Sequence, residues 1–202
     1  MGLLSIHESV VWWEYQHGKS TGDIFSEYER PMPTPKHVLD VYGRLIDEKT
    51  KSDEDKKKEK EKIQTTELKS AAYVSRVLSR AKEKIGKELS NHANSHRLDV
   101  ETVLDDKGYL KGFDYQANTE VFIIFTLDLG VVVWYRHDSY AGKLCPDCPK
   151  EEECRQTLDT TLLEYDLTLR PDQEELHMTR QSIAIFNKLA AKEVPRYKRQ
   201  EE

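Results

Sequence analysis

All three cysteines of this chain lie in the ten-residue stretch CPDCPKEEEC, which runs from Cys145 to Cys154. Cys145 and Cys148 have the C-x2-C spacing that lets one tight turn aim two thiolates at a single metal ion, and five residues separate Cys148 from Cys154. A structural zinc site takes four ligands, usually from cysteine and histidine. We therefore expect zinc bound by Cys145, Cys148, Cys154 and the nearest histidine in the sequence, His137. More distant candidates for the fourth ligand are His92, His96 and His177.

The C-x2-C-x5-C spacing also resembles the cysteine trio that holds an iron–sulphur cluster in RecB-type nucleases. Those nucleases have a fourth cysteine far upstream and a strand with an acid and an E-x-K pattern, and this chain has neither. The resemblance therefore implies an iron–sulphur cluster as the alternative cofactor, without the nuclease activity. Pro149 departs from the usual zinc knuckle because it has no N–H to donate to a thiolate. Unligated thiols and a transient disulfide are the readings without a metal.

A second group of candidate functional residues lies in the first fifty positions, which read as three short helices. Ser5 with Glu8, and Ser20 with Asp23, are start signals for the first two helices, and Gly18 ends the first. We expect Thr34 to cap the third helix, with Pro35 in its first turn. One face of that helix is apolar, and the opposite face carries Lys36, His37, Asp40, Arg44 and Asp47.

The stretch WEYQHGKSTGDIFSEYERPMPTPKHVLDVYGRL resembles a helix-turn-helix segment, of the broad class found in sigma-factor and response-regulator DNA-binding domains. The resemblance rests on Gly18-Lys19-Ser20 before a short helix and on Thr34-Pro35-Lys36 at the start of the next. It implies that the third helix enters the major groove of double-stranded DNA. The residues expected to face DNA are Thr34, Lys36, His37, Asp40 and Arg44, with Lys19 and Ser20 near the phosphate backbone.

The charge balance keeps another reading open. Residues 1–50 contain five Lys or Arg and eight Asp or Glu, and the whole chain has a net charge of −6. DNA affinity comes largely from neutralising phosphates, so a net acidic segment also fits a trihelical domain that binds a protein or serves as a scaffold. The alternative function is therefore that of a protein-interaction adaptor.

The remaining pattern predicts an α+β fold. We expect a helix-turn-helix or winged-helix domain (1–50), a charged linker (51–63), a long helix (64–92) and an α+β sheet domain with the cysteine loop (97–195). The polar run KSDEDKKKEKEK, at 51–62, fits a flexible linker, an exposed charged helix or a wing-like loop. The apolar positions Ala71, Val74, Leu78, Ala81 and Ile85 form a seam of the kind that joins two helices, within one chain or between chains. Pairing between chains would give the homodimer that we expect.

From residue 97 the hydrophobic period changes from the helical value to two. The segments RLDVETVL, YLKGFDY, EVFIIFT and VVVWYR read as antiparallel strands, with turns at Asp106-Lys107-Gly108 and Asp128-Leu129-Gly130. LLEYDLTL, at 162–169, also alternates and predicts a further strand. A final helix is expected to begin at Asp172 and to pack on the sheet.

Several classes of protein are excluded. No apolar run reaches membrane-spanning length, so we expect a cytoplasmic protein. The sequence has no phosphate-binding glycine loop and no nucleophile elbow, and no pair of carboxylates stands out, so we expect no enzyme activity. The hypothesis is a DNA-binding transcriptional regulator whose C-terminal domain senses or assembles and is braced by a metal.

Overall fold

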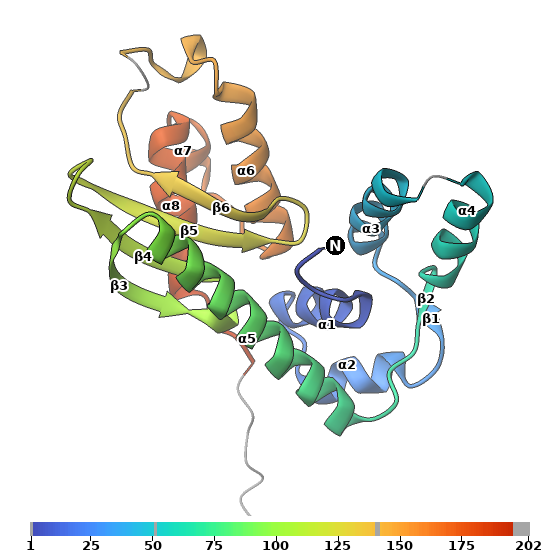
Figure 1. Ribbon diagram of the computed structural model, residues 1–202. Coiled ribbons are helices and arrows are strands. Elements are labelled where there is room, and N and C mark those ends of the chain that lie inside the picture. The colour runs from blue at the N-terminus through green and yellow to red at the C-terminus, as the bar shows by residue number, and fades with distance from the viewer. Residues whose placement is uncertain (1, 51, 140–141, 196–202) are drawn as a thin grey trace, which may run out of the picture. The chain divides into compact units, whose positions relative to one another are not determined.

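The computed structural model describes residues 2–50, 52–139 and 142–195, and its α+β class confirms the sequence prediction (Figure 1). The chain divides into two compact units. Unit 1 comprises Met1–Lys84 with the segment from Val194, and unit 2 comprises Ile85–Glu193. Among the described residues, no helix combines the length and the apolar character needed to cross a membrane.

Unit 1 is mainly helical. Its elements are α1 (Ile6–Gln16), α2 (Thr21–Tyr28), β1 (Met32–Pro33), α3 (Lys36–Lys49), α4 (Asp53–Lys62), β2 (Thr65–Thr66) and the first part of α5 (Ala71–Ser95). The two short strands pair antiparallel, with Met32 opposite Thr66 and Pro33 opposite Thr65.

The predicted starts of α1 and α2 are both confirmed. The Ser5 hydroxyl accepts the Glu8 N–H while the Glu8 carboxylate accepts the Ser5 N–H, which is a complete capping box. Ser20 and Asp23 form the same reciprocal pair at α2. Gly18, with a φ of 86°, follows the end of α1 in a conformation that suits glycine.

The predicted cap of α3 is wrong. Pro35 occupies the N-cap position and provides no side-chain hydrogen bond. The Thr34 hydroxyl is buried and hydrogen-bonds that of Thr66 at 2.8 Å. The Thr34 N–H donates to the Gln64 carbonyl at 2.9 Å. Thr34 therefore anchors the β1–β2 ribbon and does not cap α3, because its hydroxyl is hydrogen-bonded to Thr66, which is distant in the sequence.

Residues 53–62 form the exposed charged helix α4, one of the three alternatives for this run, in place of the favoured linker. Asp53, Glu54 and Asp55 occupy its first turn and Lys60 and Lys62 its last. Acids at the N-terminus and lysines at the C-terminus both interact favourably with the helix dipole. These interactions explain how a helix without buried residues forms.

The apolar seam of α5 is buried within the single chain. The Ser70 hydroxyl accepts the Tyr73 N–H at 3.1 Å and so caps the helix. The predicted seam residues Val74, Leu78, Ala81 and Ile85 are buried, whereas Ala71 is exposed. The stripe continues through Val77, Leu89 and Ala93.

Unit 2 contains the predicted antiparallel sheet. Its strands β3 (Asp99–Leu104), β4 (Tyr109–Asp114), β5 (Thr119–Thr126) and β6 (Gly130–Tyr135) lie side by side in chain order. Trp134 meets Phe186 of α8 (Met178–Ala191) on one face of the sheet. The next residue, Tyr135, points to the opposite face, where its hydroxyl lies 3.1 Å from Nδ1 of His96, just past the end of α5.

The expected strand at 162–169 is wrong, because α6 (Glu151–Glu164) occupies most of its first half. Leu158, Thr161 and Tyr165 are buried at helical spacing, whereas Leu163 is 54% exposed. The Tyr165 hydroxyl donates to the Phe125 carbonyl at 2.5 Å and ties the end of α6 to β5. The final helix is broken into α7 (Pro171–Glu174) and α8 (Met178–Ala191).

Candidate functional site

Three of the seven residues expected to face DNA form an exposed line on α3. Lys36, Asp40 and Arg44 are each four positions apart and all are exposed, so they lie above one another on the helix. The opposite face of α3 buries Val38 and Val41. This line is therefore the part of the predicted interface that a ligand could reach.

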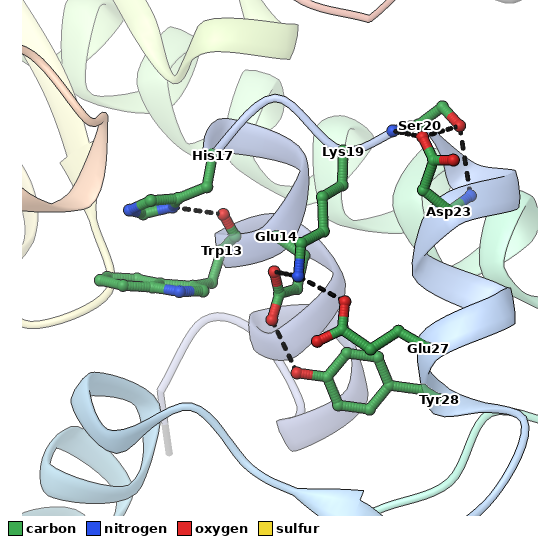
Figure 2. A network of polar contacts seen from close by, with 8 residues as sticks. All are labelled: Trp13, Glu14, His17, Lys19, Ser20, Asp23, Glu27 and Tyr28. Carbon is green, nitrogen blue, oxygen red and sulfur yellow. Dashed lines mark hydrogen bonds and ion pairs between the residues drawn. The ribbon is translucent and has the colours of Figure 1, made fainter.

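Lys19 is held by two carboxylates of its own unit. Its Nζ lies 2.7 Å from Glu14 and also contacts Glu27, as Figure 2 shows. Partial burial opposes its charge, but the hydrogen bonds to Glu14 and Glu27 outweigh that effect and raise the pKa of Lys19. Its positive charge is therefore neutralised locally, and a phosphate would have to displace these partners.

Glu14 is the buried centre of this network. The Tyr28 hydroxyl donates to Glu14 at 2.6 Å, and burial together with that hydrogen bond raises the pKa of Tyr28. The contact ties α1 to α2 (Figure 2). Nothing in the spacing of positions 14, 19 and 28 marks them as neighbours, so this network is not recognisable from the sequence alone.

Ser20 is engaged at the start of α2. Its hydroxyl donates to Asp23 at 2.6 Å and its N–H donates to the same carboxylate at 3.0 Å. The hydroxyl hydrogen bond lowers the pKa of Asp23, so a negative charge already occupies the helix N-terminus where a phosphate was expected.

His37 stacks on an aromatic ring. Its ring lies 4.9 Å from that of Trp13, between centroids, and His17 also stacks on Trp13 at 4.1 Å. The His17 Nδ1 hydrogen-bonds the Trp13 carbonyl at 2.8 Å, which fixes its ring (Figure 2). Thr34 is buried, as described above, so it cannot face a ligand in this conformation.

The cysteines lie around the start of α6. Cys145 begins the single-turn helix η2 (Cys145–Asp147), Cys148 follows it, and Cys154 lies in α6. All three are free thiols. The Lys150 N–H lies 3.4 Å from the Cys148 sulphur, so the donor that Pro149 lacks comes from the next residue. Burial, and then the neighbouring Cys148 and Cys145, raise the pKa of Cys154.

The expected metal ligands are not assembled in the described part of the chain, where no three His, Cys, Asp or Glu side chains form a group that could hold a metal ion. His137 Nδ1 hydrogen-bonds the Tyr135 carbonyl at 2.8 Å, which would leave Nε2 as its basic nitrogen. The other candidates lie elsewhere: His92 is beside Glu88, His96 beside Tyr135, and His177 at the start of α8.

Comparison with family models, with curated proteins and with solved structures finds no match to this chain.

Proposed function

We propose that the chain is a DNA-binding transcriptional regulator and that unit 1 contacts duplex DNA. The observation that carries the proposal is the exposed line of Lys36, Asp40 and Arg44 on an amphipathic helix whose other face is buried. A helix of this kind can enter a major groove while its apolar face stays in the core.

The side chains of that line have the chemistry that base edges and phosphates require. An arginine such as Arg44 can donate two hydrogen bonds to guanine, and an acid such as Asp40 can accept one from cytosine. Lys36 lies in the first helical turn, about 12 Å along the axis from Arg44. The line therefore combines groups for base contact with one for phosphate contact.

The test is fluorescence anisotropy of a labelled duplex of mixed sequence, titrated with the full chain at low and at moderate salt. We expect binding that weakens steeply as salt rises, because counterions are released from the phosphates. The Lys36→Ala/Arg44→Ala variant should bind about tenfold more weakly or worse. The matched control is Lys57→Ala/Lys58→Ala, which removes the same charge from exposed positions of α4. A wild-type chain that does not bind duplex DNA at low salt removes the proposal.

The alternative is a protein-interaction adaptor. The observation that favours it is that Lys19, Ser20, Thr34 and His37 all have partners inside unit 1, while the chain is net acidic. A largely apolar protein interface should respond little to salt. Partner capture that persists at high salt, by a chain that does not bind DNA, would support the adaptor.

Zinc and the homodimer remain predictions for the regulator. Elemental analysis of protein purified without added metal should find about one zinc per chain if Cys145, Cys148 and Cys154 share an ion, and Cys148→Ser should lower that content. Iron together with a brown colour would favour the cluster. Protein free of both metals would contradict the metal prediction without affecting the DNA proposal.

A further inference from the structure

Between the exposed acids Glu67 and Glu83, the start of α5 presents only positive charge to solvent. From residue 69 to residue 80, the exposed charged residues are Lys69, Arg76 and Arg80. Within the described part of the chain, none of these three side chains forms a hydrogen bond or an ion pair. By contrast, Lys19, Lys60 and Lys84 each lie 2.7 Å from a carboxylate. Lys69, Arg76 and Arg80 are therefore open to a ligand, unlike these three paired lysines.

The two arginines are positioned by the burial of the opposite face. Val74, Val77, Leu78 and Ala81 are buried, so the residues between them in sequence point outward. Arg76 and Arg80 are one turn apart, about 6 Å along the axis. Lys69 precedes the capping residue Ser70, at the helix end where backbone N–H groups favour an anion.

The residues between the cations are small. Ala72, Ser75 and Ser79 are exposed, so a ligand can approach the helix closely, and the serines offer hydroxyl donors. Large exposed apolar side chains are absent from residues 69–80, all of which lie in the described part of the chain. Protein interfaces are usually built around such apolar or aromatic anchors. A sugar–phosphate backbone requires only cations and hydrogen-bond donors.

We propose that Lys69, Arg76 and Arg80 form a basic stripe that binds the phosphate backbone of duplex DNA. Arginine suits this task because its planar guanidinium donates two parallel hydrogen bonds to one phosphate. The inference rests on the proposed function and assigns to α5 the phosphate contacts that were expected of the partnered Lys19 and Ser20.

The experiment measures duplex affinity against salt concentration for the wild-type chain and for Arg76→Ala/Arg80→Ala. Each lost phosphate contact should reduce the slope of log affinity against log salt by about 0.9, so the double variant should lose roughly 1.8. Its affinity at moderate salt should fall on the order of tenfold. Both arginines are exposed, so circular dichroism should confirm an intact fold.

Two further variants serve as controls for the charge of the two arginines and for their position. Arg76→Lys/Arg80→Lys keeps the charge and should retain most of the salt slope. Lys57→Ala/Lys58→Ala removes the same charge from α4 and should change the slope little. If wild type binds DNA but Arg76→Ala/Arg80→Ala matches it in affinity and slope, the stripe is wrong and the proposed function stands. If wild type does not bind DNA, both proposals fail.

Discussion

At the scale of single residues, Glu14 is the buried side chain on which the contact between α1 and α2 depends. It is only 6% exposed, and its carboxylate accepts from Tyr28 and pairs with Lys19. A buried polar group is costly when its partner is removed, because its lost hydration is no longer compensated. Removing Glu14 therefore leaves the Tyr28 hydroxyl without its acceptor and breaks the contact that ties α1 to α2.

Glu14→Ala should lower the free energy of unfolding by about 1–3 kcal/mol, since it leaves the buried Tyr28 hydroxyl without its acceptor. Glu14→Gln keeps an acceptor and should cost less. The control is Glu27→Ala, which removes the exposed partner of Lys19 and should cost about 0–1 kcal/mol. Urea denaturation measures all three, and an effect of Glu14→Ala no larger than that of Glu27→Ala would contradict the prediction.

His7 makes unit 1 sensitive to pH. Its Nδ1 lies 2.8 Å from the Tyr73 hydroxyl, and burial, followed by the charge of Lys69, lowers its pKa below 6.5. Just below pH 6.5 the unfolded chain therefore binds more protons than the folded chain. The free energy of unfolding must then fall as the pH drops through that window.

The comparison is between wild type and His7→Asn at about pH 7.5 and about pH 5.5. Wild type should lose more of its unfolding free energy than the variant over this interval, because asparagine does not titrate. Equal losses in the two proteins would show that the protonation of His7 does not oppose folding.

At the scale of elements, the structure shows where the apolar seam of α5 packs, which the sequence leaves open. The seam pattern fits a helix that pairs within the chain or between chains, and the structure buries Val74, Leu78, Ala81 and Ile85 within one chain. A homodimer, if it forms, must therefore use other surfaces than these side chains.

Leu78→Ala tests this placement of the seam. The substitution should lower the free energy of unfolding by about 2–5 kcal/mol, as expected for a buried leucine. The sedimentation mass of the folded protein should match that of wild type. A stable, folded variant that has dissociated from a wild-type dimer would place Leu78 at an interface between chains.

Local signals predicted the elements well. The capping boxes of Ser5 and Ser20 involve residues three positions apart, and the turn at Gly108 needs only its own left-handed conformation, with a φ of 56°. The four strands were also recognised, because period-two alternation is a property of each segment alone. Sequence determines such features without knowledge of the rest of the fold.

The predictions that were wrong depend on contacts between residues that are distant in the sequence. Thr34 looked like a cap, but Thr66 lies beside it in the ribbon. Residues 162–169 alternate, yet Glu164 at the end of α6 and the next residue, Tyr165, are held by hydrogen bonds with Leu127, Asp128 and Phe125. The same limit applies to the candidate site. The exposed line on α3 follows from helical period, whereas the partners of Lys19 and His37 come from tertiary packing.

At the scale of the whole molecule, each unit has its own core. Ile24 lies fully buried in unit 1, and Ile123 lies fully buried in unit 2. Cores of this kind are the basis of cooperative unfolding. We therefore expect the chain to unfold in two resolvable calorimetric transitions.

Ile24→Ala and Ile123→Ala assign the transitions. Each should cost about 2–5 kcal/mol, and each should lower the midpoint of one transition while the other moves little. If both variants shift both midpoints equally, the two units unfold as one cooperative body.

The helix α5 runs without interruption from Ala71 to Ser95, and the boundary between the units falls inside it, after Lys84. Most modular proteins can be cut at a loop, but a cut here would break the backbone hydrogen bonds of a continuous helix. Either half expressed alone would carry a new helix end whose backbone groups have no cap. Natural recombination that exchanges one half for another would meet the same obstacle, so the two halves are expected to be inherited together.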